Sequence, residues 1–86
     1  MASYSIEISA TAEKQLRKLR QTDQIRVLRA IMDLSVTPHP RGCRKLRSFE
    51  DVFRIRVGTY RILYSVESRR LLVLILKVGH RKDVYR

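Results

Sequence analysis

Residues 52–64, with the sequence VFRIRVGTYRILY, contain two alternating runs that are joined by Gly58 and Thr59. Glycine can supply the positive φ of a type II′ turn, so this stretch predicts a β-hairpin with a two-residue loop. Every second cross-strand pair is then apolar on both strands, which supports this register, because a slip of one residue would mix the faces. The predicted pairs are Val57–Tyr60, Arg56–Arg61, Ile55–Ile62, Arg54–Leu63 and Phe53–Tyr64.

The second face of the predicted hairpin presents Arg54, Arg56 and Arg61 together. Like charges directly opposite each other, as in the pair Arg56–Arg61, destabilise a sheet by roughly a few tenths of a kcal/mol. We interpret this face as a binding surface for an anion. The alternative is an exposed sheet face whose arginine side chains extend apart into water.

The segments on either side of the hairpin predict one α+β domain that spans residues 1–86. Ser9 precedes apolar residues at helical spacing, so we expect it to cap a first helix. We expect residues 21–23 to separate that helix from a second one and to cap the second, which stops before Pro38. The continuous apolar run 71–76 predicts a central strand. The expected strands are residues 3–8, beside that run, and residues 43–46, 52–57, 60–66 and 71–78. The expected architecture is an N-terminal strand, an antiparallel two-helix hairpin and a twisted, mostly antiparallel sheet of four to five strands.

The charge of the chain is large and unevenly distributed. Nineteen Lys and Arg residues against eight Asp and Glu residues give a formal net charge of +11. Residues 41–86 contain 13 of the basic and four of the acidic side chains, which places +9 in the second half of the chain. A charge concentrated in this way is typical of proteins that bind a nucleic-acid phosphate backbone.

The composition also argues against several classes of protein. The single cysteine, Cys43, cannot form an internal disulfide, and no Cys/His cluster has zinc spacing. We find no secretory signal pattern, and the apolar run 71–76 is too short to span a bilayer, so we expect a cytoplasmic protein. The hairpin face that presents Arg54, Arg56 and Arg61 has no cluster of carboxylates for magnesium, so we expect no metal and no other cofactor. These residues predict a domain that binds or cleaves RNA, and they leave open which of the two it does.

A second group of candidate residues follows the last predicted strand, in the segment GHRKDVYR at residues 79–86. His80 can exchange protons near neutral pH, and arginine can hold a developing negative charge. Tyr85 can stack on a base. Since guanidinium groups keep their protons, His80 is the local candidate for proton transfer.

Three segments of the chain closely resemble the RelE branch of the RelE/ParE toxin superfamily. They are FRIRVGTYRILY (53–64), VGHRKDVY (78–85) and PRGCRKL (40–46). The resemblance implies the RelE/ParE fold, which is similar to that of microbial ribonucleases, and a toxin of a type II toxin–antitoxin pair. It also implies metal-independent cleavage of mRNA in the ribosomal A site, by attack of the 2′-OH on the adjacent phosphate.

The resemblance also assigns roles to individual residues. The catalytic positions that it matches are Arg54, Arg56, Arg61, Arg81 and the base-stacking Tyr85, to which we add His80 for proton transfer. Secondary contacts to mRNA or ribosomal RNA fall on Arg44, Lys45 and Lys82. One departure is that Arg54 and Arg56 stand where family members often have lysines, so a lysine's role as proton acceptor does not transfer to them.

The resemblance implies a cognate antitoxin as partner, commonly acidic in the segment that binds the toxin. Two alternatives stay open. One is a ParE-like inhibitor of DNA gyrase with the same fold, and the other is a nucleic-acid-binding module without catalytic activity.

Overall fold

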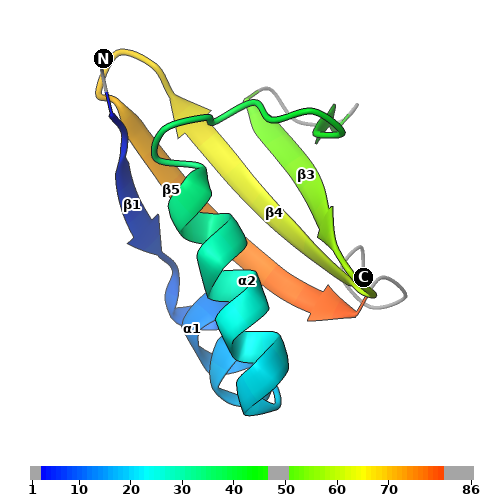
Figure 1. Cartoon of the computed structure of the whole chain (residues 1–86). Helices are drawn as coiled ribbons and strands as arrows, with labels where there is room; N and C mark the ends of the chain where they lie inside the picture. The colour runs from blue at the N-terminus through cyan, green and yellow to red at the C-terminus, as the bar shows by residue number, and fades with distance from the viewer. Residues whose placement is uncertain (1–2, 47–50, 81–86) are drawn as a thin grey trace.

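Two short helices cover one face of a five-stranded sheet in the structure, a computed structural model that describes residues 3–46 and 51–80 (Figure 1). The helices are α1 (Ala10–Arg17) and α2 (Gln21–Asp33). The strands are β1 (Ser5–Ile8), β2 (Arg44–Lys45), β3 (Val52–Val57), β4 (Tyr60–Glu67) and β5 (Leu72–His80). The expected α+β class and the order of its elements are confirmed.

The strand order in the sheet is β1-β5-β4-β3-β2. β1 runs parallel to β5, and the other neighbours are antiparallel. β5 therefore lies between two strands, as its apolar sequence predicts, and β1 pairs beside it. The prediction of a central strand with the first strand beside it is therefore confirmed, although β4 is the middle strand of the five.

The core lies between the helices and the face of the sheet toward which they pack. α1 contributes Ala12 and Leu16, and α2 contributes Val27 and Ile31. The sheet contributes residues that are at most 8% exposed: Ile55, Ile62, Tyr64, Val66, Val73, Ile75 and Val78. The opposite face of the sheet carries no helix among the described residues (Figure 1).

The helix boundaries follow local capping only in part. Ser9 caps α1 as predicted, since its hydroxyl oxygen accepts a hydrogen bond from the backbone N–H of Ala12 at 3.0 Å. The prediction that residues 21–23 cap α2 is wrong: its N-cap is Arg20, which makes no side-chain capping bond, and Asp23 lies within the first turn. Asp23 instead accepts a hydrogen bond from the Tyr60 hydroxyl at 3.0 Å, which ties α2 to the start of β4.

No helix in the described part of the chain is both long and apolar enough to span a membrane.

Candidate nucleic-acid interface

The β3–β4 hairpin has the register that its sequence predicts. All five predicted pairs are present, including Arg56 opposite Arg61 and Arg54 opposite Leu63. Gly58 has φ +61°, and Thr59 does not have a positive φ, which agrees with a type II′ turn. The arginines therefore lie on the sheet face opposite the helices.

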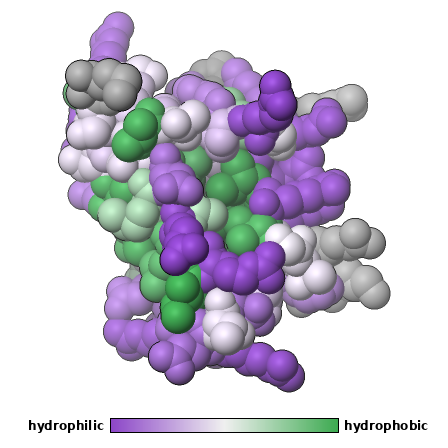
Figure 2. Space-filling model, viewed as in Figure 1, coloured by the Kyte–Doolittle hydropathy of each residue, from purple (hydrophilic) through white to green (hydrophobic). Residues whose placement is uncertain are grey.

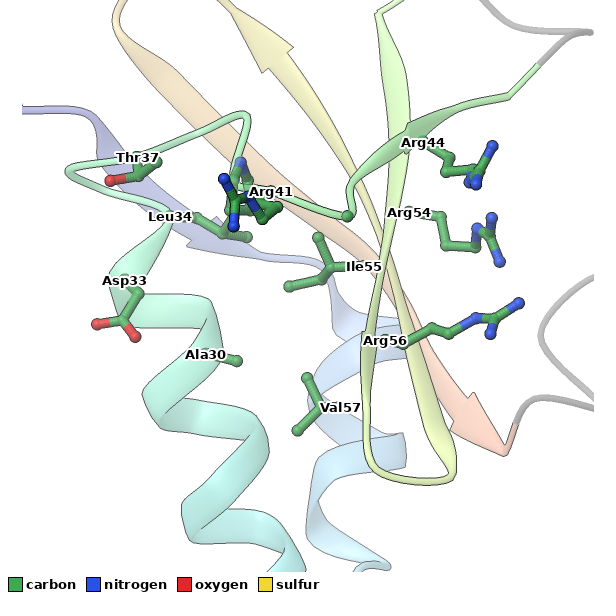
Figure 3. A pocket seen from close by; sticks show the side chains of 12 residues that line it. Ala30, Asp33, Leu34, Thr37, Arg41, Arg44, Arg54, Ile55, Arg56 and Val57 are labelled. Atoms are coloured by element: carbon green, nitrogen blue, oxygen red, sulfur yellow. The ribbon is translucent and has the colours of Figure 1, made fainter.

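The short strand β2 extends this arrangement by one side chain. Arg44 pairs with Arg54, so the two share a face. Figure 3 shows Arg44, Arg54 and Arg56 side by side and pointing away from α2, whereas Ile55 and Val57 point toward it. The described edge of the sheet thus presents three guanidinium groups in the same direction.

β5 adds a lysine that was not among the predicted site residues. Lys77 pairs with Leu63, which in turn pairs with Arg54, so these three residues form one row across the sheet. Arg61 lies in the next row, between Arg56 and Gly79. We call the side chains of Arg44, Arg54, Arg56, Arg61 and Lys77 the basic face.

The basic face has an apolar floor beneath partly desolvated cations. Leu63 lies between Arg54 and Lys77 and is only 8% exposed, although it faces away from the helices. The Nε atom of Arg61 is buried. Long basic side chains commonly cover apolar surface with their stems while the charged heads reach water. The described ion pairs of α1 (Arg17–Glu13) and of the β4–β5 turn (Arg70–Glu67) lie outside the basic face.

A β-bulge in β5 determines which side chains reach the basic face. Tyr64 pairs with Ile75 but its neighbour Leu63 pairs with Lys77, so Leu76 is the extra residue. After a bulge of one residue, the alternation of side chains between the two faces is inverted. The spacing of buried residues, two positions from Val73 to Ile75 and then three to Val78, is the sequence signal that marks it.

The same bulge places His80 away from the arginines. His80 pairs with Tyr60, whose hydroxyl reaches α2, and the two rings meet edge to face with centroids 6.3 Å apart. His80 is therefore on the helix side of the sheet, and the expectation that it joins the arginines is not met. In a strand without the bulge, His80 would have shared the face of Arg61.

The remaining predicted residues divide into two groups. Lys45 pairs with Phe53, which belongs to the helix side, so its side chain starts from the face opposite the basic face. Arg81, Lys82 and Tyr85 lie outside the described residues. Of the nine residues predicted as site residues, the described structure brings together Arg44, Arg54, Arg56 and Arg61.

A groove of about 510 Å³ runs along the helix side of the same sheet edge. Its apolar part is lined by Ala30 and Leu34 of α2 and by Ile55 and Val57 of β3 (Figure 3). Figure 2 shows apolar side chains between α2 and this edge, with hydrophilic side chains gathered beyond β3. Arg44, Arg54 and Arg56 of the basic face line this groove as well, so the groove and the basic face meet along the sheet edge.

The chemistry of the basic face is that of anion binding. Guanidinium groups form bidentate, charge-assisted hydrogen bonds to phosphate, and they hold negative charge that develops during a reaction. They do not act as bases, because they keep their protons in proteins. Among the described residues, no group of three or more His, Cys, Asp or Glu side chains is arranged to hold a metal ion.

The sequence matches, over residues 6–85, a protein family described as the ParE toxin of the type II toxin–antitoxin system parDE. The toxin RelG of Mycobacterium tuberculosis is 36% identical over 88 residues, which cover 96% of this chain and 97% of RelG. The mRNA interferase toxin RelE of Escherichia coli is 26% identical over 87 residues, which cover 96% of this chain and 90% of RelE.

Toxin chains in solved toxin–antitoxin complexes share the fold of this chain. A chain in the crystal structure of the toxin–antitoxin complex RelBE2 from Mycobacterium tuberculosis superposes with a TM-score of 0.82 at 36% identity, covering 96% of this chain and 97% of that one. A chain of the archaeal RelE–RelB complex from Pyrococcus horikoshii superposes with a TM-score of 0.83 at 30% identity, covering 95% of this chain and 99% of that one.

Proposed function

The chain belongs to the RelE/ParE family of type II toxins, and we propose that it is an mRNA endonuclease that inhibits translation by cutting mRNA on the ribosome. The observation that carries this proposal is the basic face, with Arg54, Arg56 and Arg61 together on a sheet surface that no described helix covers. Relatives named RelE and described as mRNA interferases support the choice of RNA as substrate.

The proposed reaction uses the nucleophile that RNA itself carries. The 2′-oxygen forms a bond to the adjacent phosphorus, and the bond from phosphorus to the 5′-oxygen of the next nucleotide breaks. The products are a 2′,3′-cyclic phosphate and a 5′-hydroxyl, so one proton leaves the 2′-OH and one proton reaches the departing oxygen.

The arginines act on the charge that develops at phosphorus. Arg61 and Arg56 lie on adjacent strands and can hold the non-bridging oxygens between them, while Arg54 binds the backbone beside the cleaved bond. Holding the phosphate in this way also aligns the 2′-oxygen with the leaving oxygen. The carried-over positions Arg81 and Tyr85 complete the proposed site, with Tyr85 stacked on a base and Arg81 beside the leaving oxygen.

The proposed partners follow from the same chemistry. The ribosome and mRNA supply the anionic surface, and the site of action is then the cytoplasm. An antitoxin, as in the RelE–RelB complexes that share this fold, would neutralise the toxin through acidic side chains.

The deciding experiment compares mRNA cleavage on translating ribosomes by the wild-type chain, Arg61→Ala and the control Arg29→Ala on the exposed side of α2. We expect cuts within codons that leave 5′-hydroxyl ends, a loss of about a hundredfold in rate for Arg61→Ala, and little change for Arg29→Ala. A 2′-O-methyl group at the cleaved position should abolish the cut. Cleavage that survives this modification, or equal rates for all three proteins, would refute the proposed mechanism.

The ParE description of the matched family favours a second candidate, inhibition of DNA gyrase by binding. A supercoiling assay with purified gyrase separates the two. Inhibition without RNA cleavage would establish the gyrase inhibitor, and RNA binding without either activity would establish a non-catalytic module.

A further inference from the structure

We propose that Lys77 is a further RNA-contacting residue of the basic face, and that the β-bulge at Leu76 is the feature that places it there. This inference rests on the proposed function, because it assigns Lys77 to the same bound RNA. It adds a lysine from β5 to a site that is otherwise built from arginines on β2, β3 and β4.

The bulge places Lys77, instead of His80, on the sheet face that carries the arginines. In a regular β5, Lys77 would follow Val73 and Ile75 into the core, and His80 would lie opposite the helices. The observed register instead puts Val78 in the core at 1% exposure and turns Lys77 to the face of Leu63. Because a buried, unpaired ammonium costs several kcal/mol, the straight strand would be strongly disfavoured with this sequence.

β1 pairs with β5 only as far as Ile75, and beyond that point residues of α1 and its N-cap bind the backbone of the bulged segment. The Ser9 hydroxyl, which caps α1, donates a hydrogen bond to the carbonyl of Leu76 at 2.9 Å. The Gln15 side-chain oxygen accepts one from the backbone N–H of Val78 at 2.7 Å. Both backbone groups flank Lys77, so α1 fixes the backbone of that residue from each side. Bulges commonly redirect side chains beside functional sites, which is the use that we assign to this one.

The position of Lys77 suits a backbone phosphate next to the one held by the arginines. Lys77 lies in one row with Arg54, two strands away, which corresponds to roughly 10 Å between the two backbones. It is a diagonal neighbour of Arg61, at a typical separation of about 7–8 Å. An ammonium group is a compact point charge rather than a planar fork, so it suits a contact to the backbone that needs no fixed orientation.

The test measures binding of the toxin to ribosomes programmed with an mRNA whose A-site codon carries 2′-O-methyl groups, over a range of salt concentrations. The variants are Lys77→Met, Lys77→Arg, Arg56→Ala and the control Lys14→Met, an exposed lysine on α1. Circular dichroism establishes that each variant is folded.

We expect Lys77→Met to weaken binding about tenfold at low salt. It should also reduce the slope of log K against log salt by about 0.7, the value of one lost phosphate contact on a single strand. Lys77→Arg should keep both the affinity and the slope, and Lys14→Met should resemble the wild type. If Lys77→Met binds like the wild type while Arg56→Ala binds weakly, the inference about Lys77 is wrong and the proposed function stands. If the wild type does not bind, or Arg56→Ala binds equally well, the proposed function fails and this inference fails with it.

Discussion

Arg56 and Arg61 lie directly opposite each other across the β3–β4 hairpin, and both project from the sheet face that the helices leave uncovered. Two guanidinium groups in this position repel each other in the unbound protein. A phosphate between them would relieve the repulsion, and since the hairpin backbone holds both groups in place, little reorganisation is needed when the phosphate binds. The Arg56–Arg61 pair therefore lowers the stability of the unbound fold and strengthens the binding of a phosphate.

Replacing Arg56 with threonine should raise the stability of the protein while it removes activity. Removal of the like-charge pair should increase the free energy of unfolding by about 0.5 kcal/mol at low salt. The gain should shrink in 1 M salt, because exposed charges are then screened. Urea denaturation at both salt concentrations measures the first effect, and cleavage on ribosomes, expected to fall about a hundredfold, measures the second. A stability gain that is equal at both salt concentrations would show that charge repulsion is not its cause.

Replacing Gly58 with alanine should destabilise the hairpin that carries the arginines. Gly58 has φ +61°, a conformation that costs an L-residue roughly 1–2 kcal/mol. An added Cβ would also lie 3.1 Å from the Arg26 guanidinium, although that flexible side chain can move. The matched control is Thr59→Ala in the same turn, where φ is not positive and the change should be small. Urea denaturation compares the two, and equal losses would contradict a special role for Gly58.

Replacing Tyr64 with phenylalanine should change the dependence of stability on pH. Tyr64 is fully buried, its hydroxyl donates a hydrogen bond to the Pro38 carbonyl at 2.8 Å, and burial raises its pKa above the ordinary value of 10.0. In the wild type the unfolded chain therefore ionises first, so stability is kept below pH 10 and falls as the pH rises above it.

Tyr64→Phe should cost about 1 kcal/mol at pH 8 through the lost hydrogen bond. The difference from the wild type should narrow at pH 11, because the variant has lost this ionisation. Tyr60, whose pKa is raised chiefly by its hydrogen bond to Asp23, is present in both proteins and contributes equally to each. A constant difference between pH 8 and pH 11, measured by urea denaturation, would contradict the argument.

The hairpin and its arginines could be predicted from the sequence because their determinants are local. The alternation of residues 52–64 and the glycine at position 58 fix the turn, the register and the faces without help from the rest of the chain. The placement of the residues after the bulge could not be predicted in this way. The hydrogen bonds that hold the bulged segment come from Ser9 and Gln15, which are 67 and 63 positions from their partners. The local sequence pattern therefore predicts His80 on the wrong face of the sheet and does not identify Lys77.

The start of α2 illustrates the same limit. Asp23 is a good capping residue by type, but in the structure it lies within the first turn of the helix and accepts a hydrogen bond from the Tyr60 hydroxyl. A contact with a residue 37 positions away has replaced the local capping bond. Local preference is a weak guide where a tertiary hydrogen bond can satisfy the same side chain.

The hydrogen bond between Gln15 and the backbone of Val78 gives a direct test of how α1 supports the bulge. In Gln15→Leu the Val78 N–H, on a residue that is 1% exposed, loses its acceptor, which should cost about 1–3 kcal/mol. Gln15→Glu keeps an acceptor oxygen at the same position and should restore most of the loss. Urea denaturation measures the cost, and hydrogen exchange at the Val78 amide should be faster in the leucine variant than in the glutamate variant. If both variants exchange and unfold like the wild type, Gln15 does not hold this segment, and the bulge must be fixed by the packing of Val78 and by Ser9 alone.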